Sequence, residues 1–179
     1  MVCGHYAAAL ADDLPGAWRI ATFLRDPVKR SLSMIAHRHR RAMSLPQLAR
    51  FVKPDISAWL DQEEFVERQI RDYQTKVFAL GGRGNVNRPY TIDAPAFARA
   101  TERLLTADFV GLSERLADSI RLFEQFSKIR LGPIPHRNKS PSYAASTAEI
   151  ARIRTLVPHD LELYEVARMK FEQALAAAA

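Results

Sequence analysis

The sequence predicts an α/β fold that is rich in helices and contains a short parallel sheet. Two short apolar runs, at residues 20–24 and 108–112, are typical of buried strands, and each is followed by apolar residues at helical spacing. The chain has 179 residues, of which 47% are hydrophobic and 26% charged. This size and composition suit one globular core, so we expect a single domain over residues 1–179.

Charge and composition narrow the possible functions. The net charge of +6 and the isoelectric point near 9.8 favour an anionic partner, such as a nucleotide, a polyanion or an acidic surface. The single cysteine, Cys3, excludes an internal disulfide framework. We find no apolar run of membrane-spanning length and no signal-peptide pattern, so we expect no stable membrane insertion and a cytoplasmic location. We expect no metal, because potential ligands do not cluster at useful spacing.

The first predicted strand leads into a turn that is suited to an anion. After residues 20–24, Asp26 is a good helix N-cap and Pro27 fits the first helical position. A strand, a sharp turn and a helix present free N–H groups and the positive end of the helix dipole. Arg25 falls at the carboxyl end of the strand and Ser33 on the helix, a pair that suits a phosphate. The alternative is an ordinary strand–helix unit with a solvated Arg and Ser.

The rest of the chain predicts further helices. They are expected at residues 6–14, from 44 to 48 onward, and at 57–80, 94–106, 113–128, 147–156 and 160–174. The basic run H-R-H-R-R at residues 37–41 either attracts phosphate or sulfate groups of an acceptor or is a solvated helix end. It has no interleaved aromatic residues, which argues against nucleic acid as the partner.

Several motifs resemble one enzyme family. The segment R-D-P-x-x-R-S-x-S at residues 25–33 resembles the 3′-phosphate-binding segment of sulfotransferases that use 3′-phosphoadenosine 5′-phosphosulfate (PAPS). It is most similar to carbohydrate sulfotransferases typified by the heparan sulfate 2-O- and 6-O-sulfotransferases and their bacterial relatives. F-V-G-L-S-E-R at residues 109–115 and L-V-P-H-D-L-E-L-Y-E-V-A near the C-terminus resemble structural segments of that family. D-Y-Q-T-K at residues 72–76 resembles its N-x-Q-T-[RK] segment near the substrate cleft, or is an exposed polar helix face.

The resemblance implies a P-loop-NTPase-like sulfotransferase fold and transfer of a sulfuryl group from PAPS to a hydroxyl, with a carbohydrate as the expected acceptor. It implies that Arg25 and Ser33 hold the 3′-phosphate of PAPS. It also implies that His5, of the pair G-H, is the catalytic base on the acceptor hydroxyl; the alternative is an exposed terminal residue. A loop ending in N-K-S would close over the cofactor, or would be a basic loop without a ligand; its candidates are Arg137, Lys139 and Ser140.

One part of the family pattern has no counterpart in this sequence. The family's K-T-A-G-T-S loop, which follows its first strand and cradles the 5′-phosphosulfate, is not found. We therefore expect a sulfotransferase-like domain that lacks the first strand and its loop and is weak as a catalyst by itself. One alternative is a non-catalytic module that binds a nucleotide or polyanion, and another is a basic helical nucleic-acid binder.

Overall fold

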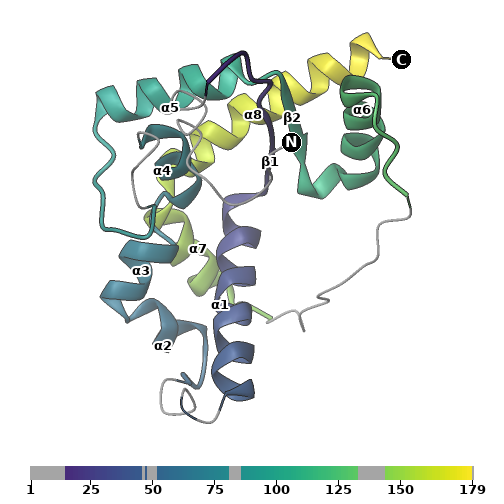
Figure 1. Ribbon diagram of the computed structural model, residues 1–179. Coiled ribbons are helices and arrows are strands. Elements are labelled where there is room, and N and C mark those ends of the chain that lie inside the picture. Colours follow the sequence, from purple (N-terminus) through teal and green to yellow (C-terminus); the bar gives the residue numbers. More distant parts are fainter. Residues whose placement is uncertain (1–14, 46, 48–51, 81–85, 133–143, 179) are drawn as a thin grey trace.

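A computed structural model describes residues 15–45, 47, 52–80, 86–132 and 144–178 (Figure 1). Within these ranges the chain forms strands β1 (Ala21–Leu24) and β2 (Phe109–Leu112) and a series of helices. The helices are α1 (Pro27–Ser44), α2 (Ile56–Leu60), α3 (Glu63–Gln69), α4 (Tyr73–Ala79), α5 (Ala94–Thr106), the 3-10 helix η3 (Ser113–Arg115), α6 (Leu116–Ser127), α7 (Thr147–Leu156) and α8 (Pro158–Ala177). The expected helix-rich α/β class is therefore observed.

The two strands form a short parallel sheet. They pair in register from Ala21 opposite Phe109 to Leu24 opposite Leu112. Both predicted strands are confirmed, each beginning one residue later than expected. Strand β2 is buried along its whole length because α6 and α8 pack against it (Figure 1). The hydroxyl of Ser119 on α6 accepts from the Leu112 N–H at 2.8 Å and donates to the Leu112 carbonyl at 3.0 Å, which satisfies that end of the strand.

A glycine on β2 allows a phenylalanine ring to lie against the sheet. A Cβ atom added at Gly111 would stand 2.6 Å from a ring carbon of Phe23 on β1 and 3.1 Å from one of Phe109. The rings of Phe23 and Phe109 are 5.5 Å apart and tilted, an arrangement that favours aromatic contact. The aromatic packing over this face of the sheet therefore requires the absence of a side chain at residue 111.

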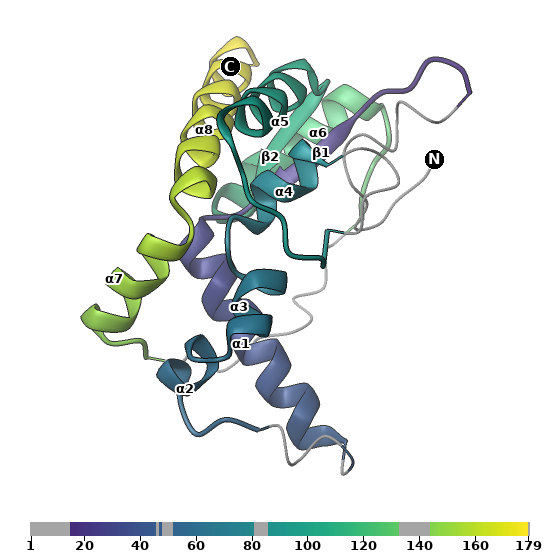
Figure 2. The same ribbon diagram turned by 90° about the vertical axis from the view of Figure 1, so that its left-hand side faces the viewer.

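The buried apolar side chains form two clusters. One lies around the sheet and includes side chains of α4, α5, α6 and α8; its fully buried members include Leu104, Leu163 and Phe171. The other joins α1 to α2, α3 and α7 and includes Ile35, Trp59 and Ile153. Figures 1 and 2 show α1 leading away from the sheet toward α2 and α7. The turn between β1 and α1 lies where the two clusters meet.

Some predicted helix boundaries are wrong. Residues 57–80 do not form one long helix but the three short helices α2, α3 and α4, and Asp72 between α3 and α4 adopts a left-handed conformation with φ of 41°. Ser44 is the last residue of α1 and not the cap of a new helix, and most of residues 46–51 lie outside the described residues. Ser113 begins a 3-10 turn, and α6 starts at Leu116 without a side-chain cap. The predicted bounds of α5 and α7 are confirmed. Helix α8 starts at Pro158, two residues before the predicted start at residue 160.

Candidate anion-binding site

The turn between β1 and α1 has the predicted helix start but not the predicted free N–H groups, because the N–H groups of Arg25, Asp26 and Lys29 donate to side chains. Arg25 follows the last residue of β1, and the Asp26 carboxylate accepts from the Lys29 N–H at 2.8 Å. Pro27 occupies the first position of α1. The N-cap and the proline are thus both confirmed, and together they fix where the helix begins.

The backbone of Arg25 is held by a side chain from α4. Gln74 Oε1 accepts from the Arg25 N–H at 3.0 Å, and Gln74 Nε2 donates to the Arg25 carbonyl at 2.8 Å. One amide therefore satisfies both backbone groups, as a neighbouring strand would do in a wider sheet. This pairing fixes the backbone from which the Arg25 side chain projects.

A second side chain holds the next residue of the turn. Glu114 Oε1 accepts from the Asp26 N–H at 3.2 Å, while its Oε2 accepts from the Tyr164 hydroxyl at 2.8 Å. Burial, with a smaller contribution from this carboxylate, raises the pKa of Tyr164, so the hydroxyl stays protonated and remains a donor. Glu114 thus links the turn to the end of β2 and to α8.

The polar ends of Arg25 and Ser33 remain available to a ligand. Both residues are half-buried. Neither the Arg25 guanidinium nor the Ser33 hydroxyl forms a hydrogen bond or ion pair with a described residue. By contrast, the hydroxyl of Ser31 on the same helix donates to the Pro27 carbonyl at 2.8 Å. The structure therefore places both predicted phosphate-binding residues on one strand–turn–helix unit with their polar groups unused.

A neighbouring arginine has a structural role. The guanidinium of Arg30 donates to the Gln69 carbonyl and lies 3.9 Å from the centre of the Tyr73 ring. Burial lowers the pKa of Arg30, and the nearby Arg25 contributes in the same direction. Arg30 therefore ties α1 to α3 and α4 and adds positive charge beside Arg25.

Two buried carboxylates hold α4 and α8 together. Asp160 belongs to α8 and lies at the N-terminus of α4, while Asp72, which precedes α4, lies at the N-terminus of α8. Asp160 on α8 accepts from the N–H groups of Gln74 at 3.1 Å and Thr75 at 2.7 Å. Asp72, just before α4, accepts from the Asp160 N–H at 3.1 Å and contacts His159 Nδ1 at 2.9 Å. Burial raises the pKa of Asp160 to about 6, with a smaller contribution from the charge of Asp72. The pair positions the backbone of Gln74.

The interpretation of residues 72–76 as an exposed helix face is wrong. Asp72, Thr75 and Lys76 are all buried, and Lys76 is completely so. Its ammonium group donates to the Glu67 carbonyl, and burial lowers its pKa. Lys76 is therefore part of the support of the site, whereas Gln74 is the residue of this segment that reaches the turn.

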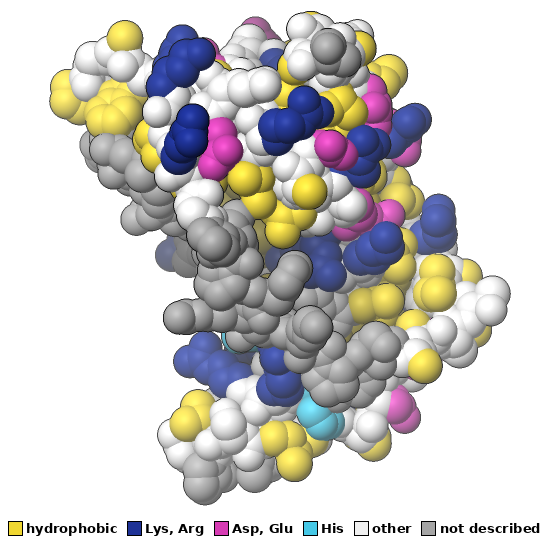
Figure 3. All heavy atoms as spheres, turned by 90° about the vertical axis from the view of Figure 1, so that its right-hand side faces the viewer, with side chains coloured by type: hydrophobic (Ala, Val, Ile, Leu, Met, Phe, Trp, Pro, Cys, Tyr) yellow, Lys and Arg dark blue, Asp and Glu magenta, His cyan; other side chains and the backbone are white. Residues whose placement is uncertain are grey.

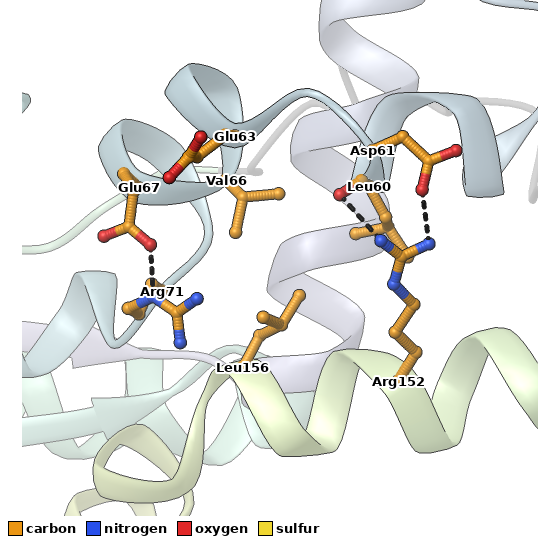
Figure 4. A pocket seen from close by; sticks show the side chains of 8 residues that line it. All are labelled: Leu60, Asp61, Glu63, Val66, Glu67, Arg71, Arg152 and Leu156. Carbon is orange, nitrogen blue, oxygen red and sulfur yellow. Dashed lines mark hydrogen bonds and ion pairs between the residues drawn. The ribbon is translucent and has the colours of Figure 1, made fainter.

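The described residues also form a surface pocket beside α3 and α7. It has a volume of about 310 Å³ and carries both acidic and basic groups (Figure 4). Its cations are already paired: Arg152 bonds Asp61 at 2.8 Å, and Arg71 bonds Glu67. Because both guanidinium groups are neutralised by carboxylates, this pocket is a poorer anion site than the β1–α1 turn.

The other predicted site residues cannot be placed. The candidate base His5 and the loop residues Arg137, Lys139 and Ser140 lie outside the described residues. Among the residues that are described, no three His, Cys, Asp or Glu side chains come together as metal ligands. In the same part of the chain, no helix has the length and apolarity needed to cross a bilayer.

Comparisons with known proteins give no match, whether to protein-family models, to curated proteins or to solved structures.

Proposed function

We propose that the chain is a PAPS-dependent sulfotransferase, with the P-loop-like fold of that class, which acts on a hydroxyl of a carbohydrate. The observation that carries the proposal is that the polar groups of Arg25 and Ser33 have no partner among the described residues, at the end of a parallel strand and on the helix that follows it. A guanidinium and a hydroxyl at such a position suit the 3′-phosphate of PAPS. The motif R-D-P-x-x-R-S-x-S supports the same assignment.

The proposed reaction is an in-line displacement at sulfur. The acceptor hydroxyl oxygen forms a bond to sulfur, and the bond between sulfur and the 5′-phosphate oxygen breaks. Adenosine 3′,5′-bisphosphate leaves with the bonding electrons. The hydroxyl proton passes to a base, for which His5 is the candidate by resemblance. Arg137, Lys139 and Ser140 are the candidates for closing over the 3′-phosphate.

The rigid support of the turn also favours ligand binding. Gln74 and Glu114 hold two successive backbone N–H groups, so Arg25 meets an anion from a fixed backbone. When a site is already ordered before the ligand binds, less binding free energy is lost to ordering the protein. A polar side chain on a fixed backbone, without a partner among the described residues, suits a ligand-binding role.

The proposal is tested by calorimetric titration of the chain with adenosine 3′,5′-bisphosphate. We expect saturable binding that the Arg25→Ala variant loses. Arg121→Ala is the matched control, because it removes one exposed positive charge from α6, where Arg121 is 3.9 Å from Asp118. Equal loss in both variants, or no binding by the folded wild-type chain, would contradict the 3′-phosphate site.

Catalysis needs a separate measurement, which is transfer of labelled sulfuryl groups from PAPS to carbohydrate acceptors. Turnover that Arg25→Ala removes supports a sulfotransferase. Nucleotide binding without turnover on any acceptor supports the alternative, a non-catalytic nucleotide-binding module, because such a module needs only the anion site.

A further inference from the structure

We propose that Asp160 is a positioning residue of the β1–α1 site. Its ionised carboxylate fixes Gln74, and through Gln74 the backbone of Arg25, so that an anion binds tightly only while this carboxylate is charged. The inference rests on the proposed function for the identity of the anion, but the coupling itself is argued from α4, α8 and the turn. A buried negative charge therefore supports the binding of a negatively charged ligand.

Asp160 supplies the N-terminal cap that α4 otherwise lacks. The first N–H groups of a helix have no acceptor within the helix. Asp72 precedes α4 with a φ of 41°, and its side chain makes no cap bond to this helix. Instead, Oδ2 of Asp160 accepts from the Gln74 N–H at 3.1 Å, and Oδ1 accepts from the Thr75 N–H at 2.7 Å and the Thr75 hydroxyl at 2.8 Å. A carboxylate from α8 thus holds the first turn of α4.

The division of these donors between the two oxygens decides what protonation does. Oδ1 receives two bonds and Oδ2 receives one longer bond, so a proton on Oδ2 displaces fewer donors. A protonated carboxyl oxygen is a donor and no longer suits the Gln74 N–H. Protonation of Asp160 therefore releases Gln74 and leaves Thr75 bound. Gln74 is also the residue whose side-chain amide holds the Arg25 N–H and carbonyl at 3.0 and 2.8 Å.

Charged groups from three elements surround Asp160, which is 1% exposed. Arg30 of α1 and Lys76 of α4 are the cations that face it, and Asp72 is the neighbouring carboxylate, itself in contact with His159. Burial raises the pKa of Asp160 to about 6; hydrogen bonds from α4 oppose this rise, and the charge of Asp72 adds to it. The ionised form is therefore present at neutral pH and is lost in mildly acidic solution.

Electrostatics alone predicts the opposite effect on an anion. Burial lowers the pKa of Arg30, while the charge of Asp160 raises it and that of Arg25 lowers it further, so Arg30 lies near both. Lys, Arg and His side chains also gather in the lower part of the face drawn in Figure 3. Neutralising Asp160 makes the surroundings of Arg25 more positive, which by itself strengthens anion binding. Weaker binding after neutralisation therefore indicates a change in how Arg25 is positioned.

The test uses Asp160→Asn, which keeps the shape of the side chain but places an amide N–H₂ group where Oδ2 accepts from Gln74. Asp93→Asn is the matched control, because it neutralises another carboxylate that caps a helix, at the Ala96 N–H of α5. Binding of adenosine 3′,5′-bisphosphate is measured by calorimetry between about pH 5 and 8. We expect Asp160→Asn to bind on the order of fivefold more weakly than wild type at the alkaline end, with the ratio of the two affinities approaching one at the acidic end. Titration of the ligand itself cancels in this ratio, and Asp93→Asn should follow wild type throughout.

A second measurement follows the backbone amide signal of Arg25 by NMR without ligand. We expect a transition near pH 6 in wild type that Asp160→Asn lacks. A transition that persists in the variant would belong to another group, such as His159, and would overturn the assignment, as would unchanged or tighter nucleotide binding by Asp160→Asn.

The two measurements keep this inference apart from the proposed function. The NMR transition without nucleotide binding at any pH would refute the proposed function but support the link from Asp160 to Arg25. Nucleotide binding that Arg25→Ala loses and Asp160→Asn keeps would do the reverse.

Discussion

Replacing Gln74 by alanine should destabilise the turn that carries Arg25. The substitution leaves the Arg25 N–H and carbonyl without the two bonds that the amide makes at 3.0 and 2.8 Å. An unsatisfied buried polar group costs about 1–3 kcal/mol, and the partial burial of Arg25 lets water replace some of the loss. Taking the lower figure for each group, we expect the free energy of unfolding to fall by about 2 kcal/mol.

Gln69→Ala is the matched control for this prediction. Gln69 is also a helical glutamine, and its side-chain amide makes one exposed hydrogen bond, to Asn87 at 2.8 Å. The change in helix propensity is the same for both substitutions, so it cancels in the comparison. We expect Gln69→Ala to change the free energy of unfolding by less than about 0.5 kcal/mol.

Urea unfolding followed by circular dichroism measures both variants, and calorimetry measures their affinity for adenosine 3′,5′-bisphosphate. Gln74→Ala should also bind the nucleotide more weakly, because the backbone under Arg25 is no longer held. If the two variants unfold at the same urea concentration and bind alike, the Gln74 amide does not hold the turn and the prediction is refuted.

Three further predictions concern the surroundings of the site. Tyr164→Phe removes the hydroxyl that donates to Glu114 and should lower the free energy of unfolding by about 1.5 kcal/mol, which lowers the urea midpoint; an unchanged midpoint would contradict this. Gly111→Ala should lower the free energy of unfolding by about 1–3 kcal/mol in the same assay. Adding Phe23→Ala to this variant should remove most of the loss, because it makes room for the new methyl group. Burial raises the pKa of Asp160 from 3.8 to about 6. The protonated carboxyl group therefore adds about 3 kcal/mol to the free energy of unfolding below about pH 4, and this contribution is lost as the pH rises through 6. The difference in unfolding free energy between wild type and Asp160→Asn should follow this pH range, and a constant difference would refute it.

The β1–α1 unit could be predicted from the sequence because its signals are local. Apolar β-branched residues indicate the strand, and Asp26 and Pro27 act within the first turn of α1 that they begin. The same holds for α5, where Asp93 caps the helix by accepting from the Ala96 N–H at 2.8 Å. Contacts between residues that are close in sequence produce local sequence patterns, from which strands and helix starts can be predicted.

The support of the site depends on contacts between distant residues and was missed for that reason. Gln74 lies 49 residues from Arg25, and Glu114 lies 88 residues from Asp26. Nothing local distinguishes Gln74 from a solvated glutamine on a helix. The resemblance of D-Y-Q-T-K to a family segment was the one available signal for it.

The break between α3 and α4 was also not predictable from apolar periodicity. The apolar residues keep helical spacing through this region, but Asp72 turns the chain with a positive φ. That conformation is stabilised by tertiary contacts, since the Asp72 carboxylate bonds the Asp160 N–H and His159. Long-range bonds therefore override local helix propensity here.

The proposed contact between Arg25 and the 3′-phosphate of the nucleotide is tested by a cycle of one variant and two ligands. The affinities of wild type and Arg25→Ala are measured for adenosine 3′,5′-bisphosphate and for adenosine 5′-monophosphate, which lacks the 3′-phosphate. We expect Arg25→Ala to weaken binding of the bisphosphate strongly and to leave binding of the monophosphate nearly unchanged. Equal weakening of both ligands would contradict it, because Arg25 would then contact some other part of the nucleotide.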